Sequence, residues 1–579
     1  MIHLVLLLGS MMAMSLVPGP WTPLATQALP WSADEDEEDK DYWEDVPFGA
    51  DDFAEVRRFV KLFYIDPNYD KHLAWISAAN QALRTMDPPR EILPEALYKK
   101  YRAAGDKRVG AEFTRLKGTD AFVIHVPPKE PRESASAMTP KEIRAKKAKL
   151  RKRQEELEKA FARVPFTEAD FERIVAFIKE TEQNNPKFRL DNVYIAAAQG
   201  YLAALDPHST IISAKAWEES TRTTADGSFE GIGAVLTKKG EETIIETPME
   251  GQPAFEAGLR AGDIIVAVDH KPVTGMDLSK VVKRIRGPKG TSVTLTIRRL
   301  GEPKDMDITI VRNHIEVKNV QARLIERHPD VGYVKVTGFV PSTRDLTEAE
   351  IGALEQQAKG KRLRGLILDL RNNAGGLLQE AVDMADDFLE DGTIVSVKDQ
   401  SEKDEVYRAS PGGHRLPLVV LVNSSSASAA EILASAIQDN KRGLVVGERT
   451  FGKASVQTLL NPLLRRDYYI KLTVARYYAP SGRTIQVTGV IPDIAVPPEP
   501  TGEPPEPFRE EDLAHHLGAL SGDYPSPNSE LVKTVKACDK KMGIADQVLK
   551  ADPNPQVKPD YQLLKAADYL ECLIQATTP

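Results

Sequence analysis

Short apolar runs that alternate with helical segments in the second half of the chain constrain its fold more than any other feature. Three of these runs have the length and the continuous apolarity of buried strands. They occupy residues 365–370, 417–422 and 443–446, and helical patterns at 377–389 and 429–438 lie between them. Strand–helix–strand units of this kind form a mostly parallel sheet with helices on its faces. The pattern therefore predicts a layered α/β core over residues 315–496.

The preceding block, residues 228–314, combines short strands, glycine turns and one short amphipathic helix. Its run AGLRAGDIIVAVDHKPV (257–273) is similar to the signature of bacterial PDZ domains. The resemblance implies a carboxylate-binding loop and a peptide-pairing strand in EGIGAVL (230–236). The backbone N–H groups that would form a nest for a C-terminal carboxylate are those of Gly231, Ile232, Gly233 and Ala234. A glycine-rich β-turn without a ligand is the alternative.

The chain begins with an apolar, charge-free stretch that ends in small residues near Ala28. This pattern is typical of a secretory signal peptide over residues 1–28. A membrane anchor is the alternative, but Pro18, Pro20 and Pro23 leave an apolar run that is short for a span. We therefore expect an extracytoplasmic protein, in the periplasm of a bacterium, with an acidic, flexible segment over 29–50 after the signal. The formal net charge of -9 argues against a nucleic-acid partner.

The other segments of the 579-residue chain fit a multidomain organisation. Residues 51–227 predict a helical N-terminal region, with a long charged helix inserted between about 90 and 185. A Pro-rich linker is predicted over 497–525 and a helical C-terminal tail over 526–579. The tail holds the only two cysteines of the sequence, Cys538 and Cys572. In an oxidising compartment they are expected to form a disulfide, and two buried thiols are the alternative.

The segment VVGERTFGKASVQ, residues 445–457, has the glycine and lysine spacing of a phosphate-binding loop, G-x-x-x-x-G-K. Such a loop needs Ser or Thr directly after the lysine, to bind magnesium, and a helix that begins there. Ala454 follows Lys453 instead, and the β-branched residues after it predict a strand. A nucleotide-binding function is therefore disfavoured, and Lys453 needs another role.

Ser428 lies where the strand at 417–422 passes into the helix that begins at Ala429. A serine at such a junction can be exposed, and a helix N-terminus favours the negative charge that a nucleophile generates. Ser428 and Glu431 also match the S-x-x-E pattern of a capping box. On local sequence alone, a purely structural role for Ser428 is therefore the alternative.

A serine nucleophile needs a base, and Lys453 is better placed for this role than the histidines of the core, His314, His328 and His414. A lysine amine can act as a base only if burial lowers its pKa from about 10.4 toward neutrality. The apolar residues around Lys453 predict such burial. In an extended segment Gln457 shares a face with Lys453, where its neutral amide can orient the amine without adding a charge.

The run LDLRNNAGGLL (368–378) ends a strand, turns at two asparagines and opens a helix at Gly375 and Gly376. The free N–H groups at the start of that helix can line an oxyanion hole. A plain strand–turn–helix connection is the alternative.

These motifs together resemble the carboxyl-terminal processing proteases, also called tail-specific proteases. The matching motifs follow the family's order from about 190 to 496: LDPHS, the PDZ block, LDLRNNAGGLL, LVNSSSASAAEI, GERTFGKASVQ and LTVARYYAPSGRTIQVTGVIPDI. Position by position, the resemblance implies that Ser428 is the nucleophile, Lys453 the general base and Gln457 the residue that orients Lys453.

The resemblance also implies that the N–H groups of Ala429 and of Gly375 or Gly376 are the oxyanion donors. The sequence departs from the family at Ala374, where a proline is usual, and in the insertion between about 90 and 185. The loss of that proline loosens the turn but removes no functional group.

The family implies a serine endopeptidase with a layered α/β core like that of Clp protease and crotonase. It implies an extracytoplasmic location, no metal, no cofactor, and protein substrates whose exposed, nonpolar C-terminal tails are recognised by the PDZ domain. The alternative function is a catalytically silent PDZ scaffold that binds peptides. We expect a homo-oligomer, a dimer or larger, and the sequence leaves open whether an adaptor protein is needed.

Overall fold

The computed structural model describes Trp43 and most of residues 46–577. The residues inside that span that it does not describe are 106–108, 110–112, 117–120, 128–139, 219–227, 240–241, 250, 261, 277, 300–301, 303, 317–318, 359, 361, 402, 463–466, 501–506, 520–528 and 543–559. The predicted signal peptide, 1–28, and residues 29–42, 44 and 45 of the acidic segment lie outside the described residues. No helix in the described part of the chain has both the length and the apolarity needed to cross a membrane.

The α/β core is built on a six-stranded sheet in which β13 pairs antiparallel at one edge and the other five strands are parallel. In order, its strands are β13 (Val320–Ile325), β14 (His328–Val336), β15 (Gly365–Asp369), β18 (Leu418–Val422), β19 (Leu444–Gly447) and β22 (Ile494–Ala495). Every residue of β15 and β18 is buried, because helices cover both faces of the sheet. The predicted layered core is confirmed.

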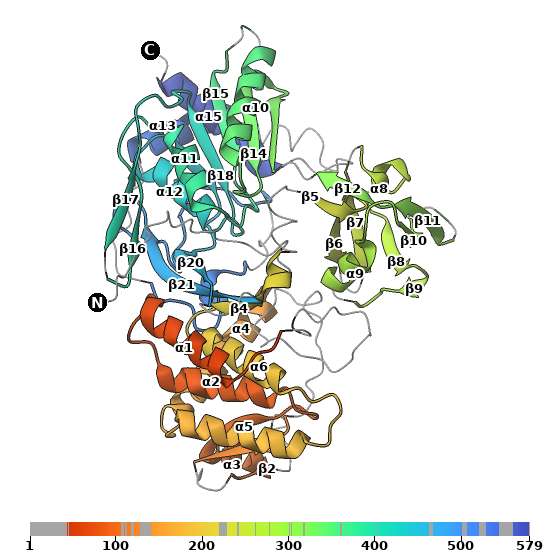
Figure 1. Cartoon of the computed structure of the whole chain (residues 1–579). Helices are drawn as coiled ribbons and strands as arrows, with labels where there is room; N and C mark the ends of the chain where they lie inside the picture. Colours follow the sequence, from red (N-terminus) through yellow and green to blue (C-terminus); the bar gives the residue numbers. More distant parts are fainter. Residues whose placement is uncertain are drawn as a thin grey trace, which may run out of the picture.

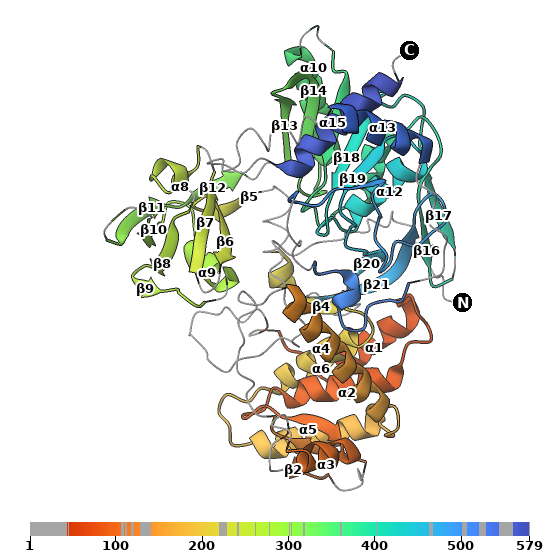
Figure 2. The ribbon, with the colours of Figure 1, turned by 180° about the vertical axis from the view of Figure 1, so that it is seen from behind.

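The helices of the core form two layers, one on each face of this sheet (Figure 2). One layer consists of α10 (Thr343–Gln357), α11 (Leu378–Asp386) and α12 (Ala429–Asp439), and the other of α13 (Ser529–Met542) and α15 (Tyr561–Thr577). The C-terminal tail therefore completes the core.

A second sheet carries the segment that follows Lys453. Its strands are, in order, β17 (Asp404–Arg408), β16 (Thr393–Asp399), β21 (Tyr468–Tyr478) and β20 (Ser455–Leu460). A fifth strand, β4 (Thr210–Ser213), comes from the N-terminal region and pairs antiparallel with β21. This pairing holds the LDPHS motif, residues 205–209, next to the second sheet.

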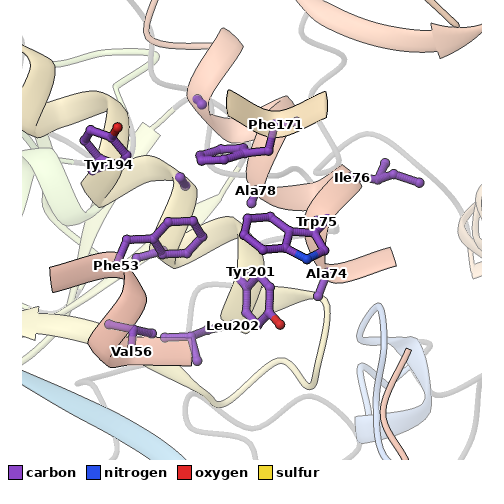
Figure 3. Close-up of a cluster of buried hydrophobic side chains, with 14 of the residues drawn as sticks. Phe53, Val56, Ala74, Trp75, Ile76, Ala78, Phe171, Tyr194, Tyr201 and Leu202 are labelled. Carbon is purple, nitrogen blue, oxygen red and sulfur yellow. The ribbon is translucent and has the colours of Figure 1, made fainter. Parts of the chain in front are cut away.

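The N-terminal region lies below the core in Figure 1 and packs four helices around an aromatic cluster (Figures 1 and 3). The helices are α1 (Ala50–Phe63), α2 (Lys71–Leu83), α5 (Glu168–Glu182) and α6 (Leu190–Ala203). The ring centroid of Trp75 lies 5.3 Å from that of Phe171, 5.5 Å from that of Tyr201 and 5.7 Å from that of Phe53. Aromatic pairs at these distances stabilise a core beyond the burial of their area.

The insertion departs from the predicted all-helical pattern of residues 51–227. Besides the predicted charged helix, here α4, it contains a three-stranded antiparallel sheet and a further helix. These elements are β1 (Glu91–Pro94), α3 (Glu95–Ala103), β2 (Phe113–Thr114), β3 (Phe122–His125) and α4 (Pro140–Phe161). All four residues of β3 are buried. Its apolar run is only three residues long, too short to produce a recognisable period in the sequence.

The block at 228–314 forms its own sheet and core, to one side of the α/β core in both views (Figures 1 and 2). The sheet order is β11 (Met306–Val311), β10 (Ser292–Arg298), β8 (Ile264–Val268), β7 (Glu242–Pro248) and β6 (Ala234–Lys239). The smaller elements are α8 (Pro253–Glu256), α9 (Leu278–Ile285), β9 (Lys271–Pro272) beside β8, and β5 (Ser228–Gly231) paired with β12 (Asn313–Glu316). β6 is the last strand of its sheet, and no strand among the described residues pairs with its other side, where a further strand could add.

The segment predicted as a Pro-rich linker, 497–525, is more than a linker. Its described part from 507 to 519 includes a short 3-10 helix, η2 (Glu510–Asp512), and Glu510 is fully buried. Arg509 donates to the backbone carbonyl of Arg449 at 2.6 Å and also contacts that of Thr450. Proline-rich composition predicts the absence of regular structure, but irregular backbone can still pack tightly against a core.

Cys538 on α13 and Cys572 on α15 are joined by a disulfide that spans 34 residues. Cys572 is buried in the layer that α13 and α15 form on the sheet. At the other end of α15, the Asp560 carboxylate accepts two hydrogen bonds from Arg371, at 2.8 and 2.6 Å, just after β15. The disulfide therefore braces a layer that also supports the segment before Gly375.

Removing this disulfide is expected to lower the free energy of unfolding. In the chain-entropy model, a bridge of this span contributes roughly 3–4 kcal/mol. Urea unfolding of wild type and of a Cys538→Ser/Cys572→Ser variant measures the difference, and reductant should affect only wild type. Two reactive thiols per chain in purified, unreduced, denatured protein would show that the bridge does not form.

Candidate active site

Ser428 occupies the sharp turn between β18 and α12. Its backbone has φ 55° and ψ -118°, a conformation that is costly for a residue with a side chain. Strain of this kind persists only where the surrounding structure enforces it. The Glu431 half of the S-x-x-E capping box is formed, because the Ser428 N–H donates to the Glu431 carboxylate at 2.9 Å. The Ser428 side chain itself makes no capping hydrogen bond to α12.

The buried Glu431 carboxylate joins Ser428 to Lys453. One of its oxygens accepts hydrogen bonds from the backbone N–H of Ser428 and that of Lys453, each at 2.9 Å. The other oxygen accepts from the N–H of Gly452 at 2.7 Å and from the Thr450 hydroxyl. Burial raises the pKa of Glu431 to about 7 in spite of these four hydrogen bonds. A single side chain thus fixes both backbone segments of the predicted dyad.

Tyr477 on β21 forms a second link between the same two residues. Its hydroxyl lies 3.1 Å from the carbonyl oxygen of Ser428 and also contacts the carbonyl oxygen of Lys453. The structure therefore brings Ser428 and Lys453 together through two buried side chains on different elements.

Lys453 lies just before β20 and is 9% exposed. Burial lowers the pKa of its amine below the ordinary value, because desolvation disfavours the charged ammonium. The carboxylates of Glu510, Asp206 and Glu431 act in the opposite direction, since each favours the ammonium form. Burial outweighs them, so this environment favours the free amine that a general base requires.

Gln457 is fully buried on β20. Its side-chain amide nitrogen donates to the hydroxyls of Ser455, at 2.9 Å, and Thr473, at 3.1 Å. Its side-chain oxygen, Oε1, is buried and has no hydrogen-bond partner among the residues that the structure describes. The predicted bond from Lys453 to Gln457 is therefore not formed in this structure, which leaves a buried acceptor unsatisfied.

Of the predicted oxyanion donors, Gly375 and Ala429 lie beside Ser428, whereas Gly376 lies against the backbone of Phe339. A Cβ atom on Gly375 would lie 2.7 Å from Ser428 Cβ and 3.0 Å from the backbone nitrogen of Ala429. The N–H of Gly375 donates to the Asn373 side chain at 2.8 Å, so it is already used. The remaining predicted donors are the N–H of Gly376 and that of Ala429, which is the first residue of α12 and has no acceptor within the helix.

Three polar residues of the site were not predicted: Asp206 and Glu510, which are fully buried, and His208, which is partly buried. The Glu510 carboxylate contacts the His208 ring nitrogen Nε2 at 3.0 Å and accepts from Gln486 at 2.9 Å. Burial alone would raise the pKa of Glu510, but His208, Gln486 and Lys453 outweigh it and hold that pKa below its ordinary value. Asp206 and His208 belong to LDPHS, a motif to which the resemblance gave no role. Nothing in the local sequence around Glu510 indicates that it reaches this site.

The predicted carboxylate-binding loop joins β5 to the edge strand β6. Gly231 pairs with Asn313, Ile232 is buried, and Ala234 begins β6. Gly233 has φ +72°, and a Cβ atom there would lie 2.5 Å from Gln252 Cβ, so a side chain would not fit. The loop thus precedes a strand edge that no described strand covers, as the resemblance to PDZ domains implies.

A metal site is not found among the described residues, where no group of three or more His, Cys, Asp or Glu side chains could hold an ion.

Residues 330–496 match the model of peptidase family S41, and residues 244–299 match that of the PDZ domain. A carboxy-terminal-processing protease of Bartonella bacilliformis is 39% identical over 303 residues, which are 52% of this chain and 68% of the relative. A carboxyl-terminal-processing protease of Synechocystis sp. is 35% identical over 324 residues, which are 55% of this chain and 74% of the relative.

A solved structure titled photosystem II D1 C-terminal processing protease is also similar. It is 32% identical, with a TM-score of 0.37, and the match covers 56% of this chain and 87% of that one. The sequence matches carry the assignment, since they include both the PDZ block and the core that holds Ser428 and Lys453. The chain therefore belongs to the carboxy-terminal processing proteases, serine peptidases of family S41.

Proposed function

We propose that the chain is an active serine endopeptidase in which Ser428 and Lys453 form the catalytic dyad. The observation that carries this proposal is the double link between the two residues through Glu431 and Tyr477, with the Lys453 amine buried. The shared hydrogen bonds to the two backbones support this pairing of nucleophile and base, and burial lowers the pKa of the Lys453 amine, which favours its free form.

In the proposed reaction, the Lys453 amine takes the proton of the Ser428 hydroxyl as the serine oxygen attacks the scissile carbonyl carbon. The oxyanion that forms accepts hydrogen bonds from the N–H groups of Ala429 and Gly376. The Lys453 ammonium then donates its proton to the departing amine, which leaves an ester on Ser428. Water hydrolyses this ester, with Lys453 again acting as the base.

Gln457 is proposed to orient the base. Its unpaired Oε1 is a buried acceptor, and an amide oxygen can hold an amine through a hydrogen bond without adding a charge.

The proposed substrates are exported proteins with exposed, nonpolar C-terminal tails. The open edge of β6 supports this proposal, because a peptide can add to it as a further strand while the loop at 231–234 binds the terminal carboxylate. Export, a homo-oligomer and an adaptor protein stay predictions.

The function is tested with a purified protein substrate that carries an unstructured, nonpolar C-terminal tail. New internal termini, identified by mass spectrometry and absent with a Ser428→Ala variant, are expected. A wild-type chain that binds the tail but produces no new termini would favour the silent PDZ scaffold.

Recognition of the free carboxylate leads to a separate prediction. A peptide with a nonpolar C-terminal residue is expected to be cleaved about tenfold more efficiently than its C-terminal amide, because the amide loses the charge-assisted hydrogen bonds of the nest. The ratio of kcat/KM for acid and amide measures the effect. Equal values would show that the loop at 231–234 does not bind a carboxylate.

A further inference from the structure

A chain of buried hydrogen bonds runs from the LDPHS motif to Gln457. The Asp206 carboxylate accepts from the Thr473 hydroxyl at 3.0 Å, and the same hydroxyl oxygen lies 3.1 Å from the amide nitrogen of Gln457. Asp206, Thr473 and Gln457 are each fully buried. Thr473 lies on β21 directly opposite Gln457 on β20, so the strand pairing fixes this contact.

The hydrogen bonds of this chain fit one orientation of the Gln457 amide. The Thr473 hydroxyl donates its proton to Asp206, and its oxygen also lies 3.3 Å from the Ser209 hydroxyl. With its proton given to Asp206, the Thr473 oxygen accepts from Gln457, so the amide nitrogen faces Thr473. The oxygen Oε1 of Gln457 is thereby turned to the other side, where it lacks a partner.

Asp206 is itself held rigidly. It accepts from the backbone N–H groups of His208, at 2.8 Å, and Ser209, at 3.0 Å, and from the Ser209 hydroxyl at 2.6 Å. The Ser209 hydroxyl in turn accepts from the backbone N–H of Thr473 at 3.0 Å. The motif is therefore attached to β21 at Thr473 itself, in addition to the pairing of β4.

We propose that Asp206 is a positioning residue for catalysis, which acts through Thr473 to fix the amide of Gln457 with its oxygen available to the Lys453 amine. This inference rests on the proposed Ser428–Lys453 dyad. It gives the N-terminal region a part in the reaction, because Asp206 lies between α6 and β4 and comes from outside the sequence of the core.

The pH dependence of activity provides a second test of the proposed role of Asp206. The charged groups around Lys453 are Glu510, Asp206 and Glu431, with the Lys471 amine within electrostatic reach and His208 in contact with Glu510. The negative charge of Asp206 raises the pKa of Lys453. Replacing it by a neutral group therefore lowers that pKa, and the acid limb of the activity profile moves to lower pH.

The experiment compares kcat, KM and pH profiles of the full-length chain with one tailed peptide. Thr473→Val and Asp206→Ala break the chain of hydrogen bonds, and each is expected to lower kcat about 10- to 100-fold with KM little changed, because a misplaced base costs rate rather than binding. Thr473→Ser keeps the hydroxyl and should retain most of the wild-type kcat. Asp206→Asn keeps an acceptor oxygen but no charge, so it should be more active than Asp206→Ala, with its acid limb at lower pH.

Thr347→Val is the matched control, since Thr347 is buried on α10 and donates to the Thr343 carbonyl oxygen at 2.9 Å, outside the proposed site. It should lose stability without a change of kcat. If wild type cleaves the peptide and the folded Thr473→Val and Asp206→Ala variants keep kcat within twofold, the positioning role is overturned. If Thr473→Val does not fold, the positioning role is overturned by an Asp206→Asn variant whose kcat and acid limb both equal those of wild type. If wild type and Ser428→Ala are equally inactive, the proposed dyad fails instead.

Discussion

Replacing Ser428 with alanine is expected to abolish peptide cleavage, with a loss in kcat of at least about 10⁴-fold. The change removes one oxygen atom, and that hydroxyl makes no capping hydrogen bond to α12. The fold and the binding of C-terminal peptides should therefore be unchanged. Rates with a tailed peptide, together with thermal unfolding, measure the two effects.

The neighbouring serines provide the controls for this prediction. Ser425 is exposed, and Ser425→Ala should keep wild-type activity. Ser426 is fully buried, where its hydroxyl donates to the Leu370 carbonyl oxygen at 2.8 Å and accepts from the Asn423 N–H at 3.0 Å. Ser426→Ala should therefore lower stability while the folded enzyme still turns over. Loss of turnover in folded Ser426→Ala, with activity in Ser428→Ala, would place the nucleophile two residues earlier.

Replacing Lys453 with alanine is expected to lower kcat as much as replacing Ser428 does, because a serine hydroxyl without its base is a poor nucleophile. In wild type, kcat/KM should rise with pH as Lys453 loses its proton, since only the free amine can take the proton of Ser428. Burial lowers the pKa of Lys453, so the rise should begin below the range of an exposed lysine. A pH series under conditions where chemistry limits the rate measures this.

A flat pH profile for wild type, or substantial cleavage by Lys453→Ala, would exclude Lys453 as the base. His208 is the natural candidate in that case, because its ring contacts Glu510 in the same buried cluster. His208→Ala distinguishes the two, since it should retain most activity if Lys453 is the base.

The part of the fold that could be predicted from the sequence is the part set by local pattern. The strands at β15 and β18 are continuous apolar runs bounded by turns, which is why the layered core could be predicted. Ser428 and Lys453 could be proposed because each lies at a junction next to a predicted strand, and Gln457 because it shares a face with Lys453 in an extended segment. The resemblance to the family supplied their roles. The sheet in the insertion could not, since β3 is a four-residue strand among charged and Pro-rich segments.

The polar surroundings of the dyad depend on contacts between distant segments. Asp206 and Thr473 are 267 positions apart, and His208 and Glu510 are 302 apart. Local sequence patterns cannot predict these contacts. The contacts form because β4 pairs with β21 and because the 507–519 segment packs against the core. The hydrogen bond from the Gly375 N–H to the Asn373 side chain likewise could not be predicted, because it depends on where that side chain lies in the folded structure.

The most direct test of the central claim, that Ser428 and Lys453 act as one catalytic unit, is the residual kcat of Ser428→Ala, Lys453→Ala and the double variant with one tailed peptide. Residues that work in a single step lose their combined effect when either is removed, so the losses do not add. The account predicts three equally low rates, within about threefold of one another. A double variant slower than both single variants by the product of their losses would contradict it.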